Sequence, residues 1–248
     1  MPDEKDMKAN WESSFAEQVK AGTFNTAPVE TLVRNVSYYL RDKYPTGDLS
    51  HLRFLEMGSG AGPNLIWLAQ KGIRVSGADI SPLALDLCRK SFQTQNLEGM
   101  IDDLVETSVD QTPWPDETFD GILESCVFQH LDRETRERTF AEIRRLLKPG
   151  GIFCGYMLSQ GHSVYQQKKE SEQADDPGTL VLEEGGSRFY LTDIGLSHFF
   201  QADEFNRLLE GFSVVDPCLT EYYLPRFEAQ KRGYKQYKQS MWAVYAVK

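Results

Sequence analysis

The chain has 248 residues, 40% of them hydrophobic, which is enough to bury the core of one large domain. Its net charge of −10 disfavours a nucleic acid as the main partner, because a phosphate backbone usually meets a basic face. The Lys and Arg residues within 226–238 are interleaved with aromatics and predict a solvated helix or loop. Four cysteines without a CxxC pair, a charged N-terminus and no apolar run of membrane length predict a cytoplasmic protein without a membrane partner.

Strand and helix patterns alternate along most of the chain. An amphipathic helix is predicted over 28–40, with Pro28 in its first turn. The strands predicted after it are 52–57, 73–79, 103–109, 119–125, 151–158, 212–219 and 241–247. The helices predicted between them are 63–72, 81–92, 133–151 with its Pro-Gly-Gly stop, and 203–211.

This alternation indicates an α/β fold with a mostly parallel seven-stranded sheet covered by helices on both faces. The last two strands have no helix pattern between them and predict an antiparallel hairpin at one edge. We expect a helical lead-in or lid over 1–50 and a main domain over 51–248. Within that domain, residues 159–200 are polar and without a sustained period, and we expect them to form an insertion that caps the substrate site.

The segment FLEMGSGAGPN at 54–64 ends an apolar strand in three alternate glycines, Gly58, Gly60 and Gly62. Glycines here let the backbone turn tightly and approach a ligand, and the following helix directs its amides the same way. Asp79 ends the next predicted strand, where a carboxylate can accept hydrogen bonds from both hydroxyls of a ribose. The residues therefore predict an adenosine-like ligand bound across the first two strands.

The glycine loop lacks the sequence features of dinucleotide-binding and phosphate-binding loops, which disfavours those two classes of ligand. The dinucleotide fingerprint needs a sixth-position glycine where this chain has Pro63, and no GK[ST] sequence of a phosphate-binding loop occurs. A Tyr-x-x-x-Lys pair of short-chain oxidoreductases occurs three times, which we interpret as chance in a chain with 11 tyrosines. The pairs are Tyr39/Lys43, Tyr165/Lys169 and Tyr234/Lys238.

Four motifs occur in the order and spacing of the class I S-adenosylmethionine-dependent methyltransferases. They are the segment 54–64, the DISP that starts at Asp79, PWPDETFD at 113–120 and LLKPGG at 146–151. Over roughly residues 50–158 the chain resembles this family, and most of all the small-molecule branch that includes tellurite-resistance and thiopurine methyltransferases. NWESSFAEQVKAGTF at 10–24 resembles the tryptophan-bearing lead-in of that branch. The resemblance implies a Rossmann-like fold, S-adenosylmethionine as cofactor and a small-molecule acceptor.

The resemblance also implies roles for the glycine loop and the two acids. Glu56, Gly58, Gly60 and Gly62 would surround the methionine half of the cofactor. Asp79 would hold the ribose.

Further positions are implied for the adenine. Ile80 would pack on the ring, and Asp110 or the amide of Val109 would meet its edge. The family often has an acid two residues before Asp110, where this chain has Ser108.

The residues after the fourth strand, Ser125 and Cys126, would lie beside the methyl donor. A sulfonium methyl group is already activated, so the protein mainly holds the acceptor in line and excludes water, and we expect no metal. A general base is needed only where the acceptor does not readily lose its proton. His130 and His198 are the candidate bases, and each has a purely structural role as the alternative.

Substrate choice is expected to lie where the resemblance ends. Trp11, Tyr190 and Tyr222 are the candidate substrate-binding residues, in an aromatic pocket for a planar or apolar molecule. The alternative is that such rings form the core of the cap, which we favour for Phe199 and Phe200.

Two other functions stay open at this point. An NAD(P)-dependent oxidoreductase is disfavoured by Pro63 and by the run at 113–120. A non-catalytic S-adenosylmethionine-binding protein is disfavoured by the intact glycines and Asp79. The acceptor molecule, the acceptor atom and the oligomeric state cannot be deduced from the sequence.

Overall fold

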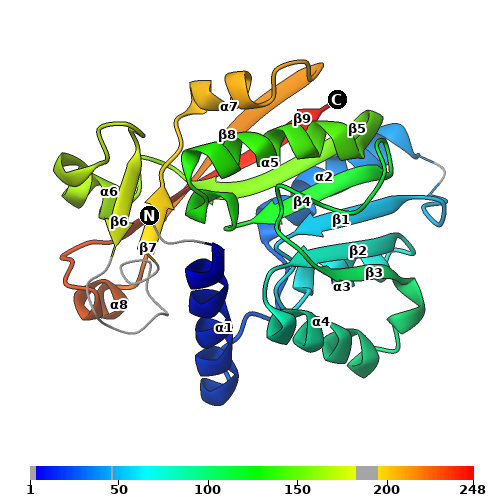
Figure 1. Cartoon of the computed structure of the whole chain (residues 1–248), viewed down its shortest axis with the longest axis horizontal. Helices are drawn as coiled ribbons and strands as arrows, with labels where there is room; N and C mark the ends of the chain where they lie inside the picture. The colour runs from blue at the N-terminus through cyan, green and yellow to red at the C-terminus, as the bar shows by residue number, and fades with distance from the viewer. Residues whose placement is uncertain (1–3, 46, 183–194) are drawn as a thin grey trace.

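The computed structural model describes residues 4–45, 47–182 and 195–248. Its central element is a seven-stranded sheet with the order β3-β2-β1-β4-β5-β9-β8 (Figure 1). The strands from β3 to β5 in that order pair parallel, and β9 is antiparallel to both of its neighbours. The strands are β1 (Arg53–Met57), β2 (Arg74–Asp79), β3 (Ile101–Glu106), β4 (Phe119–Ser125), β5 (Leu147–Leu158), β8 (Val214–Tyr223) and β9 (Lys238–Val247). The predicted Rossmann-like seven-stranded sheet is confirmed.

Helices cover both faces of this sheet. They are α2 (Glu30–Lys43), α3 (Pro63–Ala69) and α4 (Pro82–Thr94) on one face, and α5 (Arg133–Leu146) and α7 (Ala202–Leu208) on the other. Successive residues of a strand point to opposite faces, so Phe54 of β1 packs in the cluster with α2, α3 and α4. Its neighbour Leu55 packs in the cluster with α5 and α7, which Figure 1 shows in front of the sheet.

The two last strands form the predicted antiparallel hairpin at the edge. They pair from Val214 opposite Val247 to Tyr223 opposite Lys238, with β8 as the outer strand. The connection between them carries the short helix α8 (Arg226–Lys231), in agreement with the helix or loop predicted for the basic stretch.

The third strand begins and ends earlier than predicted, at 101–106 instead of 103–109. Residues after Glu106 leave the sheet because they form a turn. The hydroxyl of Thr107 donates to the carbonyl of Gln111 (2.7 Å), and the hydroxyl of Ser108 donates to the carboxylate of Asp110.

Residues 159–200 contain short regular elements that the sequence pattern did not predict. They are α6 (Ser163–Lys168), β6 (Thr179–Leu182) and β7 (Gly195–His198), with residues 183–194 outside the described part. The strands β6 and β7 pair antiparallel in a separate sheet beside the main one (Figure 1). Strands of four residues are too short to show a hydrophobic period, which explains why no strand pattern could be recognised there.

Two helices precede the sheet, α1 (Glu4–Ala21) and α2. The predicted helix over 28–40 begins at Glu30, because Val29 is extended and its N–H donates to Asn64 Oδ1 (2.8 Å). Among the helices of the described part, none has the length and apolar character needed to cross a membrane.

Candidate functional site

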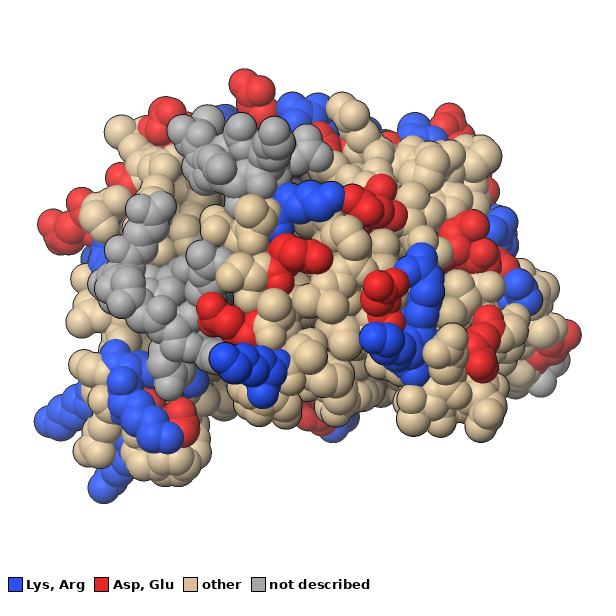
Figure 2. Space-filling view, turned by 60° about the horizontal axis from the view of Figure 1, so that its bottom comes forward, with Lys and Arg blue, Asp and Glu red and all other residues tan. Residues whose placement is uncertain are grey.

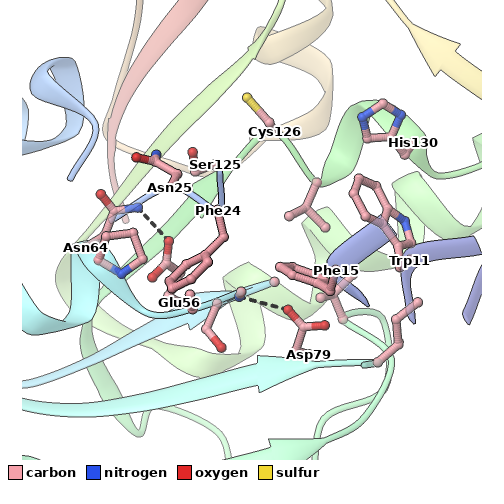
Figure 3. Close-up of a pocket in the computed structure, with 18 of the residues that line it drawn as sticks. Trp11, Phe15, Phe24, Asn25, Glu56, Asn64, Asp79, Ser125, Cys126 and His130 are labelled. Atoms are coloured by element: carbon pink, nitrogen blue, oxygen red, sulfur yellow. Dashed lines mark hydrogen bonds between the residues drawn. The ribbon is translucent and has the colours of Figure 1, made fainter. Parts of the chain in front are cut away.

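A cavity opens at the C-terminal ends of β1, β2 and β4 (Figure 3). The strand order reverses between β1 and β4, and ligands of open α/β sheets bind at such a point. Of the predicted site residues, those that line the cavity are Trp11, Glu56, Gly58, Gly60, Asp79, Ile80, Val109, Ser125, Cys126 and His130. They come from five separate segments of the chain that the sheet brings together.

The loop after β1 approaches the cavity with its backbone. Gly58 has φ of 77°, in the left-handed region, and a Cβ there would lie 2.2 Å from Val127 Cγ2. The N–H groups of Gly58 and Ser59 both donate to the carbonyl of Ala78 (2.7 and 3.0 Å), which fixes the loop on the end of β2. A side chain at position 58 would therefore be strained and would also clash.

Gly62, unlike Gly58, is required for packing between helices. It does not line the cavity, and a Cβ on it would lie 2.4 Å from Cys88 Sγ in the core. The glycine allows α3 and α4 to pack closely.

Glu56 is buried at the floor of the cavity, with 2% of its surface exposed. Asn64 Nδ2 donates to its Oε1 (2.7 Å, dashed in Figure 3), whereas its Oε2 has no hydrogen-bond partner. Burial raises the pKa of Glu56 to about 8. An unpaired buried carboxyl oxygen is costly, so this position favours a ligand that brings a donor or a positive charge.

Asp79, at the end of β2, points into the same cavity. Its Oδ2 accepts from the N–H of Gly60 (2.9 Å) and its Oδ1 from the N–H of Ser81 (2.9 Å). Burial raises its pKa, and these two hydrogen bonds oppose the rise. Each oxygen can accept one more hydrogen bond, as a vicinal diol requires.

The residues expected near the adenine edge differ in their position relative to the cavity. Ser108 and Val109 line the cavity, and Asp110 does not. The carboxylate of Asp110 instead pairs with Arg138 (2.9 Å) and accepts from the hydroxyl of Ser108.

The end of β4 turns sharply at the cavity wall. Cys126 has φ of 60°, unusual for a residue with a side chain, and its N–H donates to the carbonyl of Tyr156 (2.9 Å). The buried Glu124 Oε1 accepts from the N–H of Val127 (3.4 Å). Burial, with Glu124 nearby, raises the pKa of the Cys126 thiol to about 12, so Cys126 is a neutral wall residue.

His130 lies at the end of the short 3-10 helix η2 (Phe128–His130), against Trp11 of α1. The two rings meet edge to face with centroids 5.4 Å apart (Figure 3). Its Nδ1 is 3.1 Å from the carbonyl of Leu196 in β7, and its Nε2 is 3.2 Å from Gln129 Nε2. Burial lowers the pKa of His130 to about 4, so the ring is neutral at physiological pH.

His198 does not line the cavity. It is 1% exposed between β6 and α7, where Nδ1 is 2.7 Å from Thr179 Oγ1 and Nε2 is 3.0 Å from Glu204 Oε2. Tyr222 also lies away from the cavity lining, half exposed on the edge strand β8. Tyr190 lies outside the described residues.

Other residues of the cavity were missed in the sequence. Phe24, the last residue of the segment 10–24, and Asn25 after it line the cavity although no role was expected for either. Asn64 follows the glycine loop in the first turn of α3, and this position was a signal that could have identified it. Among the described residues, no group of three or more His, Cys, Asp or Glu could hold a metal ion.

A family of methyltransferase domains matches residues 55–155, which span β1 to β5. A curated relative from Tropheryma whipplei, demethylmenaquinone methyltransferase, is 34% identical over 166 residues, which cover 63% of each chain. The chain spans about half the length of the first curated relatives it matches, 48%, 50% and 45%.

Solved structures share the fold. An S-adenosylmethionine-dependent methyltransferase from Methanosarcina mazei aligns with a TM-score of 0.62 at 20% identity, covering 79% of this chain and 92% of its own. The 1,6-didemethyltoxoflavin-N1-methyltransferase of Burkholderia thailandensis, solved with S-adenosylhomocysteine bound, has a TM-score of 0.61 at 17% identity and covers 100% of this chain and 90% of its own. Residues 55–155 thus form a methyltransferase domain, and the sheet order and the cavity at its switch point give the chain the fold of the class I S-adenosylmethionine-dependent methyltransferases.

Proposed function

We propose that this protein transfers the methyl group of S-adenosylmethionine to an O, N or S atom of a small-molecule acceptor by in-line displacement. The observation that carries the proposal is the pair of buried acids at the cavity floor, Glu56 and Asp79. Glu56 has an unpartnered oxygen suited to an ammonium group, and Asp79 has accepting capacity suited to a diol. The amino acid and ribose ends of S-adenosylmethionine carry these two groups.

The other cavity residues suit the remaining parts of the cofactor. The backbone at Gly58 and Gly60 would approach the methionine half, and Ile80 and Val109 would contact the adenine from two sides. At the adenine edge the Ser108 hydroxyl would take the place we expected for Asp110. The bound cofactor supplies an activated methyl group on a sulfonium ion.

The acceptor would enter between the end of β4 and helix α1. Ser125 and Cys126 form one wall there, and Trp11 and His130 form another. Because α1 lies over the cavity, it would exclude water and act as the lid expected over 1–50. His130, the first candidate base, has both ring nitrogens against protein groups, Leu196 and Gln129, so in this proposal it is a wall residue. His198 and Tyr222 have no contact with the cavity, and we assign them no part in it.

A small molecule is favoured over a nucleic acid by charge. The whole chain carries −10, and Figure 2 shows Lys and Arg interspersed with Asp and Glu, apart from a lobe at the lower left where Lys and Arg gather. A tRNA methyltransferase of Danio rerio is among the relatives, at 30% identity, so tRNA is the comparison substrate to test. The cytoplasmic location stays a prediction, which the redox state of the four cysteines in cells would test.

Calorimetric titration with S-adenosylhomocysteine tests the cofactor site, with NADH as the control ligand. Asp79→Ala should raise the dissociation constant at least tenfold, since each charge-assisted hydrogen bond contributes roughly 1.5–3 kcal/mol. Asp86→Ala, an exposed acid of α4 paired with Arg89, is the matched control and should bind like the wild type. Saturable binding of NADH, or equal affinities in the two variants, would contradict the proposal.

A further inference from the structure

Gln129 is a buried side chain with a fixed orientation. It is 3% exposed in η2, and its Oε1 accepts from the N–H of Leu158 at the end of β5 (2.8 Å). A backbone N–H can only donate, so the oxygen of the amide must face Leu158 and its NH₂ group must face the other way. That NH₂ group is 3.2 Å from His130 Nε2.

The same reasoning assigns the protons of His130. Nδ1 lies 3.1 Å from the carbonyl of Leu196, which can only accept, and 3.4 Å from the hydroxyl of Ser197, which can accept or donate. The shorter contact with the obligate acceptor places a proton on Nδ1. The Nε2 atom faces a donor, the NH₂ group of Gln129, and therefore accepts. Two backbone groups, on β5 and on β7, thus define a single neutral tautomer of the ring.

His130 lies at the cavity wall, where its charge would affect the binding of a charged cofactor. His130 lines the cavity and contacts Trp11, whereas Gln129 lies behind it and does not line the cavity. Among the described residues, no charged group is a cause of the lowered pKa of His130: burial lowers the pKa, and the hydrogen bond to Leu196 opposes this. The cofactor that enters the cavity carries a positive sulfonium centre, which an imidazolium would repel in a site of low dielectric.

We propose that Gln129 is a positioning residue that holds His130 in the neutral, Nδ1-protonated form and so keeps positive charge out of the cavity that receives the sulfonium cofactor. This inference depends on the cofactor site of the proposed function. Because S-adenosylmethionine is charged at sulfur and S-adenosylhomocysteine is not, a neutral His130 favours binding of the first ligand relative to the second. The buried amide of Gln129 would contribute to this preference.

Nitrogen NMR of the histidine rings tests the tautomer in the full chain. Comparison with His130→Gln assigns the His130 signals. We expect the wild-type ring to be neutral and Nδ1-protonated from pH 5.5 to 8. In Gln129→Glu, a carboxylate that still accepts from Leu158 would face Nε2 and draw a second proton onto it, so the spectrum should become that of an imidazolium. An Nε2-protonated or doubly protonated ring in the wild type would overturn the proposal.

The affinity for S-adenosylmethionine divided by that for S-adenosylhomocysteine tests whether a neutral His130 favours the charged ligand. Gln129→Glu should lower this ratio roughly three- to tenfold, since the imidazolium would lie on the cavity side of the new carboxylate. Gln129→Met removes the donor that faces Nε2 without adding a charge, so protonation of His130 should become easier and the ratio should fall, by less than in Gln129→Glu. An equal ratio in all three proteins, or an equal change in both variants, would overturn the proposal.

Failure of the proposed function has a different signature. A folded wild-type protein that binds neither ligand would contradict the cofactor site, while the NMR spectra would still decide the tautomer of His130. A variant that fails to fold is recognised by circular dichroism, and the other variant then carries the comparison.

Discussion

At the scale of single residues, the main feature is a pair of buried carboxyl groups at the ends of adjacent strands. Met57 of β1 lies opposite Glu124 of β4, one residue after Glu56. Both Glu56 and Glu124 have raised pKa values, chiefly through burial, and both have an Oε2 without a hydrogen-bond partner. Only Glu56 lines the cavity, so it is the one whose proton a ligand can displace.

Cofactor binding should therefore release a proton from Glu56. Its pKa is raised from 4.5 to about 8, so at pH 7 roughly nine in ten cofactor-free molecules hold the proton. An ammonium group beside the carboxyl would lower this pKa and expel the proton. Calorimetry of S-adenosylhomocysteine binding in phosphate and in Tris should differ by the buffer heat of close to one proton.

The control for this prediction is Glu56→Gln, which should bind more weakly and show no dependence on the buffer.

The raised pKa of Glu56 also predicts how the stability of the cofactor-free protein depends on pH. Because the folded state keeps its proton up to about pH 8 and the unfolded state loses it near 4.5, Glu56 costs stability increasingly between these values. Glu56→Gln should thus gain stability relative to the wild type from pH 5 to pH 8, and a flat difference would contradict the assignment.

At the scale of elements, helix α1 closes the cavity through few contacts with the sheet domain. Trp11 packs on His130, and the ring of Phe15 lies 3.5 Å from where a Cβ of Gly60 would stand. Glu12 accepts a hydrogen bond from Ser81. Trp11 and Phe15 are only half buried, so the helix contributes less to the core than to the closure of the cavity.

Trp11→Ala should therefore change ligand release more than protein stability. We expect the dissociation rate of S-adenosylhomocysteine to rise roughly tenfold, because closing elements mainly set dissociation rates. Stopped-flow displacement measures this rate. Trp67→Ala, on α3 beneath the ammonium of Lys71, is the matched control outside the cavity. Equal rates in the two variants would show that α1 does not act as a lid.

The elements also show what a sequence can and cannot predict. The strands β1, β2, β4 and β5 were predictable because most of their residues are buried in the sheet and form short apolar runs. The bounds of β3 were predicted too late because it is an edge strand with partly exposed residues. Gly58, Glu56 and Asp79 were predictable because they lie in local motifs at the strand ends. The strands β6 and β7 were missed because four residues do not define a period. Glutamine is usually found at the surface of proteins, so the sequence does not indicate that Gln129 is buried. Only the tertiary fold places it between β5 and the ring of His130.

At the scale of the whole molecule, a buried polar network joins the segment of α6, β6 and β7 to the helices of the main sheet. Arg136 of α5, 2% exposed, pairs with Asp176 of that segment (2.7 Å). Asp176 also accepts from Thr179 (2.6 Å), which contacts His198, and His198 in turn contacts Glu204 of α7. The candidate base predicted at His198 thus lies in the joint between the two parts. Since β7 also supplies the carbonyl that holds His130, this joint positions one wall of the cavity.

Asp176→Asn should weaken that joint, because it leaves the buried Arg136 without its charge partner. Loss of one partner of a buried ion pair costs roughly 3–5 kcal/mol, which urea unfolding of the full chain would measure. Limited proteolysis should then cut first within 159–182. Asp175→Asn changes the adjacent, exposed acid and should alter neither measurement.

The pH dependence of this difference identifies its cause. Burial opposes ionisation of Asp176, but the hydrogen bond from Thr179 and the charge of Arg136 lower its pKa below the ordinary 3.8. The pair therefore stabilises the fold above pH 3.8, and this contribution is lost as the pH falls through the lowered value. The gap between Asp176→Asn and the wild type should shrink over that range. A gap that is constant down to pH 3 would mean that packing, rather than the ion pair, joins the segment of α6, β6 and β7 to the rest of the fold.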